Sequence, residues 1–270
     1  AIIILNLLLP LLYFSAAFVY GKYFYRKADW AKNWKRRVLL FVVLIHLLET
    51  ILRGLYYKGF PITSIYEAAS LVAFALVLIY LYIEIQIQVD TTGYFILVFV
   101  FFLQLFSSAL ATLKASLPPI FKSSLFIFHT SFGILGYASL FISALYSFLY
   151  LMLFYDLKSS RFGIFYDRLP SLETLKEVNL HTARLGFLCF FLSILLGIGL
   201  TFQLKIGSFF DFKGMASLAA LTLYGLEMVG EKLWNWSGKR LAFLNLFGFT
   251  MLLFSFLIVN FFLTSFHEFH

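Results

Sequence analysis

Long apolar stretches alternate along this chain with short polar joints that carry most of its charged residues. The apolar stretches are continuous, and they occupy residues 2–21, 38–53, 67–88, 93–113, 125–154, 182–204, 214–231 and 241–264. A transmembrane α-helix needs about 20 apolar residues, whereas a strand of a transmembrane barrel alternates in polarity over about ten. The pattern therefore predicts an all-α integral membrane protein, a polytopic bundle of about eight transmembrane helices.

The composition supports a lipid environment and limits the kinds of function. Apolar residues make up 62% of the 270 residues, charged residues make up 13%, and the mean hydropathy is +0.92. Soluble domains are roughly half apolar and a quarter charged. The joints are too short to hold a soluble domain, so we expect a single membrane domain over residues 1–270. The single cysteine, Cys189, excludes an intramolecular disulfide and a CxxC redox pair.

The net charge of +8 reflects membrane topology rather than a surface for nucleic acid, because the cations lie mostly in the joints. Fifteen of the 21 Lys and Arg residues belong to one membrane face, and six belong to the other. The fifteen lie at residues 22–37, 158–184 and 232–240, and the six at residues 53–58, 114–122 and 205–213. Since cytoplasmic joints are rich in Lys and Arg, the first face is predicted to be cytoplasmic and both termini to lie outside.

Two histidines fall at a similar predicted depth on the outer face. His129 lies about one turn into the fifth apolar stretch, and His267 lies just past the eighth. Two imidazoles with aromatic neighbours are what a bis-histidine haem needs, because the iron takes one nitrogen from each side. The alternative is that each histidine is simply a polar residue at the membrane interface. A zinc site has less support, since the chain has no HExxH motif and no cysteine cluster.

Further candidates are ionisable residues that lie within or at the edge of apolar stretches. His46 lies near the middle of the second stretch, where an ionisable residue is by default a functional candidate. Glu49 follows on nearly the same helix face and is expected to accept a ring N–H of His46, unless His46 only holds helices together. His181 begins the sixth stretch and is read as a polar residue at headgroup level. Glu227, within the seventh, could pair with a cation, serve a proton path or extend to the interface.

Four segments, in order along the chain, resemble motifs of the cytochrome c assembly family, which includes CcsA/ResC, CcmC and HemX-like proteins. Residues 128–138 (FHTSFGILGYA) resemble its histidine-containing helix, and residues 169–175 (LPSLETL) resemble the linker before its next helix. Residues 59–67 (GFPITSIYE) are similar to its G-x-F-P-L-x-N/D-L-Y-E-S loop. Residues 259–267 (VNFFLTSFH) are similar to the V-N-x-L-x-x-G-L-H close of CcsA. The resemblance covers about residues 46–267.

The resemblance implies a haem-handling protein of cytochrome c biogenesis. In the family, histidines that match His129 and His267 flank a tryptophan-rich loop on the outer face and bind the iron of haem b. The cofactor-binding residues that the resemblance implies are His129, His267, Phe209, Phe210, Asp211 and Phe212, together with His46, which matches a membrane histidine of HemX-like members. The implied partners are CcsB/ResB-like membrane subunits and apocytochrome c, and the implied location is the bacterial inner (plasma) membrane.

The chain departs from the family pattern at two points. The family loop runs W-G-x-x-W-x-W-D-P-K-E, but residues 207–213 read GSFFDFK. Phenylalanine can pack against haem, but unlike tryptophan it donates no hydrogen bond. The histidine expected near the end of the seventh stretch is missing, and Glu227 or Val229 occupies that region. These departures favour a divergent haem-binding relative close to the HemX-like branch, and they leave open whether the chain is part of a cytochrome c haem lyase (synthase) system.

Three classes of function therefore remain at this stage. The leading expectation is a protein that holds or presents haem at the outer face for attachment to apocytochrome c. The second is a HemX-like regulatory or structural membrane subunit that keeps the fold without haem transfer. The third, a small transporter, is disfavoured because the chain lacks paired Gly- or Pro-interrupted stretches in two matching halves.

Overall fold

The computed structural model describes residues 1–110, 119–204 and 212–261, and over these residues it is helical without a strand. The long helices are α1 (Ile2–Arg26), α2 (Asp29–Tyr57), α3 (Ile65–Tyr82), α4 (Gly93–Leu110), α5 (Ser124–Lys158), α7 (Leu172–Leu204), α8 (Phe212–Lys232) and α9 (Gly238–Phe261). The short elements are the π-helix η1 (Ile83–Ile87), the 3-10 helix η2 (Pro119–Lys122) and α6 (Ile164–Arg168). Each predicted apolar stretch corresponds to one long helix, so the all-α fold class is confirmed.

The outward faces of the helices fit a lipid environment. Six of the described helices are long and apolar enough to cross a membrane, namely α1, α2, α3 continued by η1, α4, α5 and α7. On α1, Leu7, Leu11, Phe14 and Phe18 are between 50% and 64% exposed, and their spacing places them on one face of the helix. Large apolar side chains in such a row are suited to contact with acyl chains, so the protein is a multi-pass membrane protein.

The described chain forms two compact units. Unit 1 consists of Ala1–Ser123 with Asp167–Leu169, and unit 2 consists of Ser124–Tyr166 with Pro170–His270. The division concerns compact packing units, and a single membrane domain over residues 1–270 remains a prediction.

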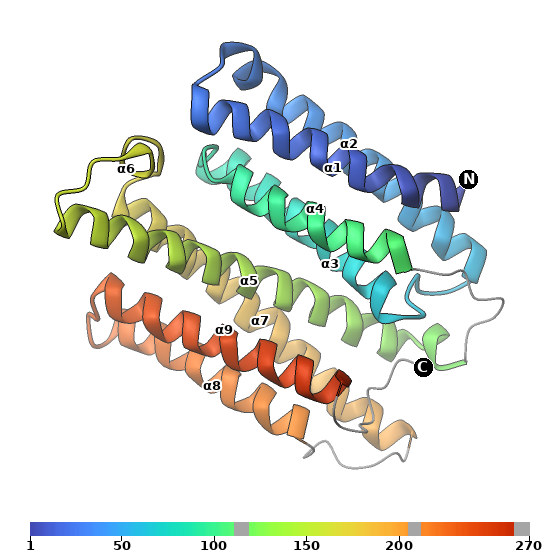
Figure 1. Ribbon diagram of the computed structural model, residues 1–270. Coiled ribbons are helices and arrows are strands. Elements are labelled where there is room, and N and C mark those ends of the chain that lie inside the picture. Colours follow the sequence, from blue (N-terminus) through green and yellow to red (C-terminus); the bar gives the residue numbers. More distant parts are fainter. Residues whose placement is uncertain (111–118, 205–211, 262–270) are drawn as a thin grey trace. The chain divides into compact units, whose positions relative to one another are not determined.

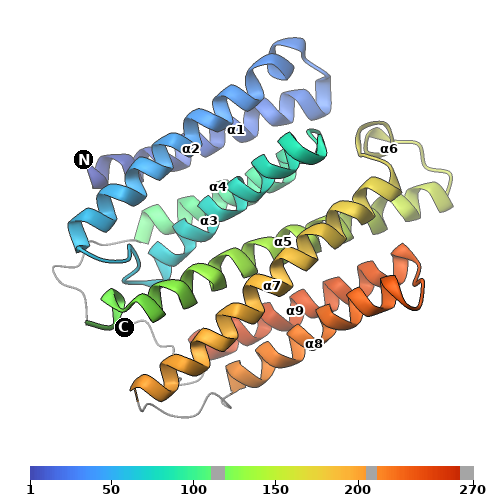
Figure 2. The ribbon, with the colours of Figure 1, turned by 180° about the vertical axis from the view of Figure 1, so that it is seen from behind.

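Unit 1 is a bundle of α1 to α4, in which α1 packs against α2 and α4, and α3 packs against α4 (Figures 1 and 2). Its largest buried side chains include Tyr13, Tyr20 and Tyr80. A glycine makes room for two of them. A Cβ atom on Gly93 would lie 2.3 Å from the hydroxyl oxygen of Tyr80 and 2.6 Å from Cδ1 of Tyr20. The start of α4 therefore approaches these tyrosines at a distance that only glycine allows.

Unit 2 is built on α5 and α7, which pack along each other, with α8 and α9 beside them (Figure 2). Glycines set the close approach of the two long helices. A Cβ atom on Gly136 would lie 3.0 Å from the backbone nitrogen of Phe190, and one on Gly186 would lie 2.5 Å from Cδ2 of Leu140. Small residues at a helix crossing let two backbones approach closely, which is a common way to join helices in lipid.

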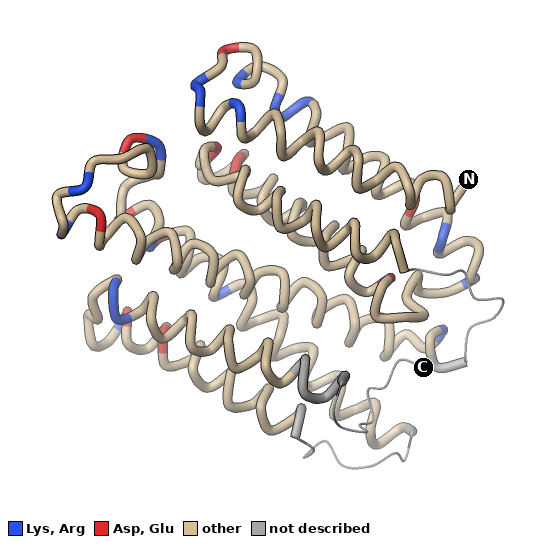
Figure 3. The backbone as a smooth tube through the Cα atoms, viewed as in Figure 1, with Lys and Arg blue, Asp and Glu red and all other residues tan. Residues whose placement is uncertain are grey.

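The cations gather at helix ends within each unit (Figure 3). In unit 1 they crowd residues 22–37, which form the end of α1, the turn at residues 27–28 and the start of α2, whereas Arg53 and Lys58 lie at the opposite end of α2. In unit 2, Lys232, Lys239 and Arg240 lie at the turn between α8 and α9. This distribution agrees with the asymmetry seen in the sequence, and the orientation of the chain in the membrane stays a prediction.

Candidate functional site

His129 lies in the second turn of α5, where it is half-buried against α7. Its ring nitrogen Nδ1 is 2.8 Å from the backbone carbonyl oxygen of Ser193. A carbonyl oxygen can only accept, so Nδ1 must carry the hydrogen and donate it. In the neutral ring the lone pair then belongs to Nε2, which is the nitrogen that could bind a metal. The second helix therefore fixes which tautomer His129 adopts.

A second contact and a glycine hold His129 in this position. The hydroxyl group of Ser193 donates to the backbone carbonyl of His129 over 2.9 Å, so one residue of α7 binds both the ring and the backbone of His129. Gly197 makes the space that the ring occupies, because a Cβ atom there would lie 2.9 Å from Cε1 of His129 and 3.2 Å from its Nδ1. Gly197 thus lets the two helices pack closely at the candidate ligand itself.

Gly197→Ala should therefore displace the ring of His129 from its packed position against α7. We expect the overpacked variant to lose about 1–3 kcal/mol of unfolding free energy. The matched control is Gly199→Ala, because a Cβ atom at Gly199 would meet Cδ2 of Leu125 at an ordinary 3.6 Å. This control should be neutral or gain up to about 1 kcal/mol, since alanine is the better helix former. Unfolding of both variants in the same detergent checks the prediction, and equal losses would mean that the ring of His129 does not rest on α7.

In unit 1, the loop that precedes α3 forms a helix cap. Ser64 is the N-cap residue of α3, and its hydroxyl oxygen accepts the backbone N–H of Glu67 over 3.4 Å. The carboxylate of Glu67 turns back and accepts both the backbone N–H (2.5 Å) and the hydroxyl group (2.6 Å) of Thr63. This is close to a capping box, in which a Ser or Thr and a Glu three residues later satisfy each other's backbone. The family-like motif at residues 59–67 therefore encodes the geometry that buries Glu67.

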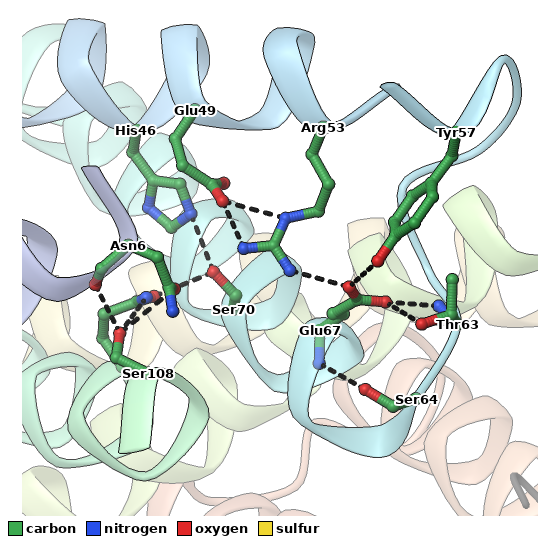
Figure 4. Close-up of polar contacts among 11 residues, drawn as sticks. Asn6, His46, Glu49, Arg53, Tyr57, Thr63, Ser64, Glu67, Ser70 and Ser108 are labelled. Carbon is green, nitrogen blue, oxygen red and sulfur yellow. Dashed lines mark hydrogen bonds and ion pairs between the residues drawn. The ribbon is translucent and has the colours of Figure 1, made fainter. Parts of the chain in front are cut away.

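Glu67 belongs to a buried ion cluster with Arg53 and Glu49 of α2 (Figure 4). The guanidinium group of Arg53 donates to Glu67 over 2.8 Å through Nη1, and to Glu49 through Nε, also over 2.8 Å, and through Nη2. The hydroxyl group of Tyr57 adds a further hydrogen bond to Glu67 at 2.8 Å. One cation thus neutralises part of the charge of two carboxylates in a place where water does not reach.

His46 is fully buried and both of its ring nitrogens have partners. Nε2 is 3.1 Å from the hydroxyl oxygen of Ser70, and Nδ1 is 2.7 Å from that of Tyr13 (Figure 4 shows the Ser70 side). Because the hydroxyl of Ser70 donates to the side-chain oxygen of Gln104, it must accept from His46, so Nε2 carries the hydrogen. Nδ1 then accepts from Tyr13. His46 is therefore a neutral histidine at the centre of a hydrogen-bond chain.

The expectation that Glu49 accepts from His46 is wrong. Glu49 binds Arg53 instead, because the charged guanidinium group four residues away attracts a carboxylate more strongly than a neutral ring N–H does. The chain from His46 continues from Gln104 to Ser108, and from Ser108 to the backbone and side chain of Asn6. It joins all four helices of unit 1. A ligand could reach His46 only by displacing Tyr13 or Ser70.

The remaining predicted site residues divide into those that the structure describes and those that it does not. His181 and Glu227 lie on α7 and α8 of unit 2, and Glu227 is fully buried, so it does not extend to the interface. His267, Phe209, Phe210 and Asp211 lie outside the described residues, as does the side chain of Phe212, the first residue of α8. The pairing of His129 with His267 across a haem therefore stays a prediction. Over residues 1–110, 119–204 and 212–261, no three His, Cys, Asp or Glu side chains gather as a metal site.

Comparison with known proteins identifies the family. The sequence profile of the family described as "Cytochrome C assembly protein" matches residues 62–267, which is well over half of the chain. The matched region contains Glu67, His129 and His267, and it agrees with the resemblance seen in the four sequence motifs. A search of curated proteins found no match.

Proposed function

Because the chain belongs to the cytochrome c assembly protein family and acts in cytochrome c biogenesis in a membrane, we propose that it binds haem b and presents it for attachment to apocytochrome c. The haem is cargo in this proposal, bound at the outer face and passed on. Bound haem would supply the vinyl groups to which the cysteine thiols of an apocytochrome add.

The single observation that carries the proposal is the fixed tautomer of His129. Haem iron takes an unprotonated imidazole nitrogen, and iron-binding histidines usually donate their other ring N–H to a carbonyl or carboxylate. The 2.8 Å contact from Nδ1 to Ser193 provides this arrangement, and the half-buried ring lies near the end of its helix. The donor chemistry of His129 therefore fits one side of a haem iron.

The opposite ligand and the wall of the site are assigned from the sequence. His267 would supply the second axial nitrogen, and the phenylalanines at residues 209–212 would pack against the macrocycle. Lys205 or Lys213 would bind the propionates. To His46 we assign a positioning role, since its two nitrogens already hold the helices of unit 1 together.

The proposal includes a place and partners for the protein. The family resemblance points to the bacterial inner (plasma) membrane, CcsB/ResB-like subunits as partners and apocytochrome c as the acceptor of haem. The excess of Lys and Arg at residues 22–37, 158–184 and 232–240 supports an orientation with both termini outside the cytoplasm. His129 and the start of α5 then face the compartment in which cytochromes c receive their haem.

A maturation assay tests this function. In a host that lacks its own counterpart of this protein but retains the partner subunits, His129→Ala should lower covalently attached haem on apocytochrome c by about tenfold or more, because an iron ligand is lost. The matched control is His270→Ala, which removes an imidazole that has no assigned part in the haem site and should leave maturation at the wild-type level. Normal maturation with stably inserted His129→Ala would contradict the proposal. It would favour the HemX-like reading, a regulatory or structural subunit that keeps the fold without haem transfer.

A further inference from the structure

Glu227 lies at the centre of unit 2, where α5, α7, α8 and α9 meet, and it is fully buried. Its oxygen Oε2 accepts from the amide nitrogen of Asn245 over 2.9 Å, and Oε1 faces the amide nitrogen of Asn179 at 3.5 Å. Within the described part of the chain Glu227 makes no salt bridge. The partners of this carboxyl group are therefore neutral amides, unlike those of the buried carboxylates in unit 1.

A buried carboxylate without a cation is costly. The penalty for removing a charge from water amounts to several kcal/mol, and hydrogen bonds from two amides offset only part of it. A carboxyl group inside a membrane bundle that lacks a cationic partner avoids this penalty when it holds a proton. The environment of Glu227 thus favours the neutral acid.

The neighbouring amide of Asn245 can form a hydrogen bond with either the ionised or the protonated form of this carboxyl group. The amide nitrogen of Asn245 is within 3.1 Å of three oxygens but has only two hydrogens to donate, while its side-chain oxygen has no hydrogen-bond partner among the described residues. The two ends of an amide are similar in size, so Asn245 can turn over in the same space. Its oxygen would then face Oε2 of Glu227 at the same 2.9 Å and accept the hydrogen of a protonated acid.

A groove large enough to hold water lies about one helical turn from this carboxyl group. This groove of about 210 Å³ lies between α7 and α8, lined by Glu173, Lys176, Glu177, Leu180, His181, Arg184 and Glu231. Glu231 follows Glu227 by one turn on α8, and Leu180 directly follows Asn179 on α7. Two of the groove residues thus adjoin the cluster that holds Glu227.

From this arrangement we propose that Glu227 is a proton-binding site within the membrane, which exchanges its proton with water in the groove between α7 and α8. Asn245 turns over as the proton comes and goes, so that it donates to the carboxylate and accepts from the acid. The site involves neither His129 nor haem, and it therefore stands or falls independently of the proposed function.

The other titratable groups around Glu227 are few. On α8 they are Tyr224, whose buried hydroxyl group makes no hydrogen bond within the part of the chain that the structure describes, and Glu231. On α7 they are His181 and Arg184 at the groove, and Arg184 binds Glu231 at 3.1 Å. Ser143 of α5 and Asn245 of α9 face the cluster as neutral groups. The cations at the start of α9 lie over aromatic rings, Lys239 over Phe154 and Tyr155, and Arg240 over Trp236.

Infrared spectroscopy of the purified, haem-free protein tests the proposal. At neutral pH the wild type should show the carbonyl stretch of a protonated carboxyl group, and the band should disappear as the pH is raised. Glu227→Gln, which has the shape of the neutral acid, should lack the band, and the matched control Glu231→Gln should keep it. A wild type without the band at neutral pH, or a band that survives Glu227→Gln, would overturn the proposal.

A chemical probe gives a second readout that needs no variant. Dicyclohexylcarbodiimide is apolar and reacts with protonated carboxyl groups inside membranes. Mass spectrometry of the peptide that contains α8 should locate the adduct on Glu227 at neutral pH, and labelling should fall at alkaline pH. An adduct found on Glu231 but not on Glu227 would contradict the proposal, even if the glutamine variant failed to fold.

Discussion

Replacement of Arg53 by methionine is expected to destabilise the protein by about 3–5 kcal/mol, the range observed when one partner of a buried ion pair is removed. Methionine fills a similar volume without the charge. Glu67 would keep hydrogen bonds from Tyr57 and Thr63, but Glu49 would lose those that it accepts from Nε and Nη2 of Arg53. The variant would thus leave two carboxylates buried together without a cation. The unfolding free energy in a fixed detergent, measured by denaturant titration, is the appropriate quantity.

Two matched variants make this test specific. Arg184→Met breaks an exposed ion pair with Glu231, so it should cost no more than about 1 kcal/mol. Adding Glu49→Gln to Arg53→Met removes one of the stranded charges and should restore part of the loss. If Arg53→Met costs no more than Arg184→Met, the cluster does not carry the charges that its geometry implies.

The apolar pattern predicted the helices well because lipid requires each spanning segment to satisfy its own backbone. It placed two helix starts too late. The second stretch was expected at residues 38–53, but α2 begins at Asp29, and the sixth was expected at 182–204, but α7 begins at Leu172. These added turns are polar, so hydropathy alone could not find them. In α2 they carry Lys35, which binds the carboxylate of Asp90 at 2.7 Å.

The sequence identified several residues of the candidate site but not the partners that they contact. His46 was found because an ionisable residue in mid-membrane is rare, yet its true partners, Tyr13 and Ser70, come from other helices. Spacing along a single helix reveals only neighbours such as Glu49. Half of the ion cluster was detectable in this way, since Glu49 and Arg53 are four residues apart on one helix. That Arg53 also binds Glu67 depends on how α2 and α3 pack, which no local pattern encodes.

His129 shows the same limit in unit 2. The motif at residues 128–138 singled it out, but nothing in the sequence connected it with Gly197 or Ser193 of α7. The connection is the short contact between α5 and α7, which orients the ring through a carbonyl of Ser193. Every residue has a backbone carbonyl, so the sequence does not indicate which one will accept the hydrogen bond.

The most direct test of the central claim is the absorbance spectrum of the purified protein after haem b has been offered in excess. The wild type should show a six-coordinate, low-spin haem, because His129 and His267 would each supply one axial nitrogen. His129→Gly and His267→Gly should each give a five-coordinate spectrum or lose haem by about tenfold or more. Added imidazole should restore the six-coordinate spectrum, since it fills the vacated position.

Two comparisons complete the measurement. His270→Ala should keep the wild-type spectrum, and Gly197→Ala should weaken haem binding more than Gly199→Ala, because only the first displaces the ring of His129. The account predicts a low-spin spectrum that depends on both His129 and His267 and that imidazole rescues. A wild-type protein that takes up no haem under these conditions, or a spectrum that survives the double change to glycine, would contradict it.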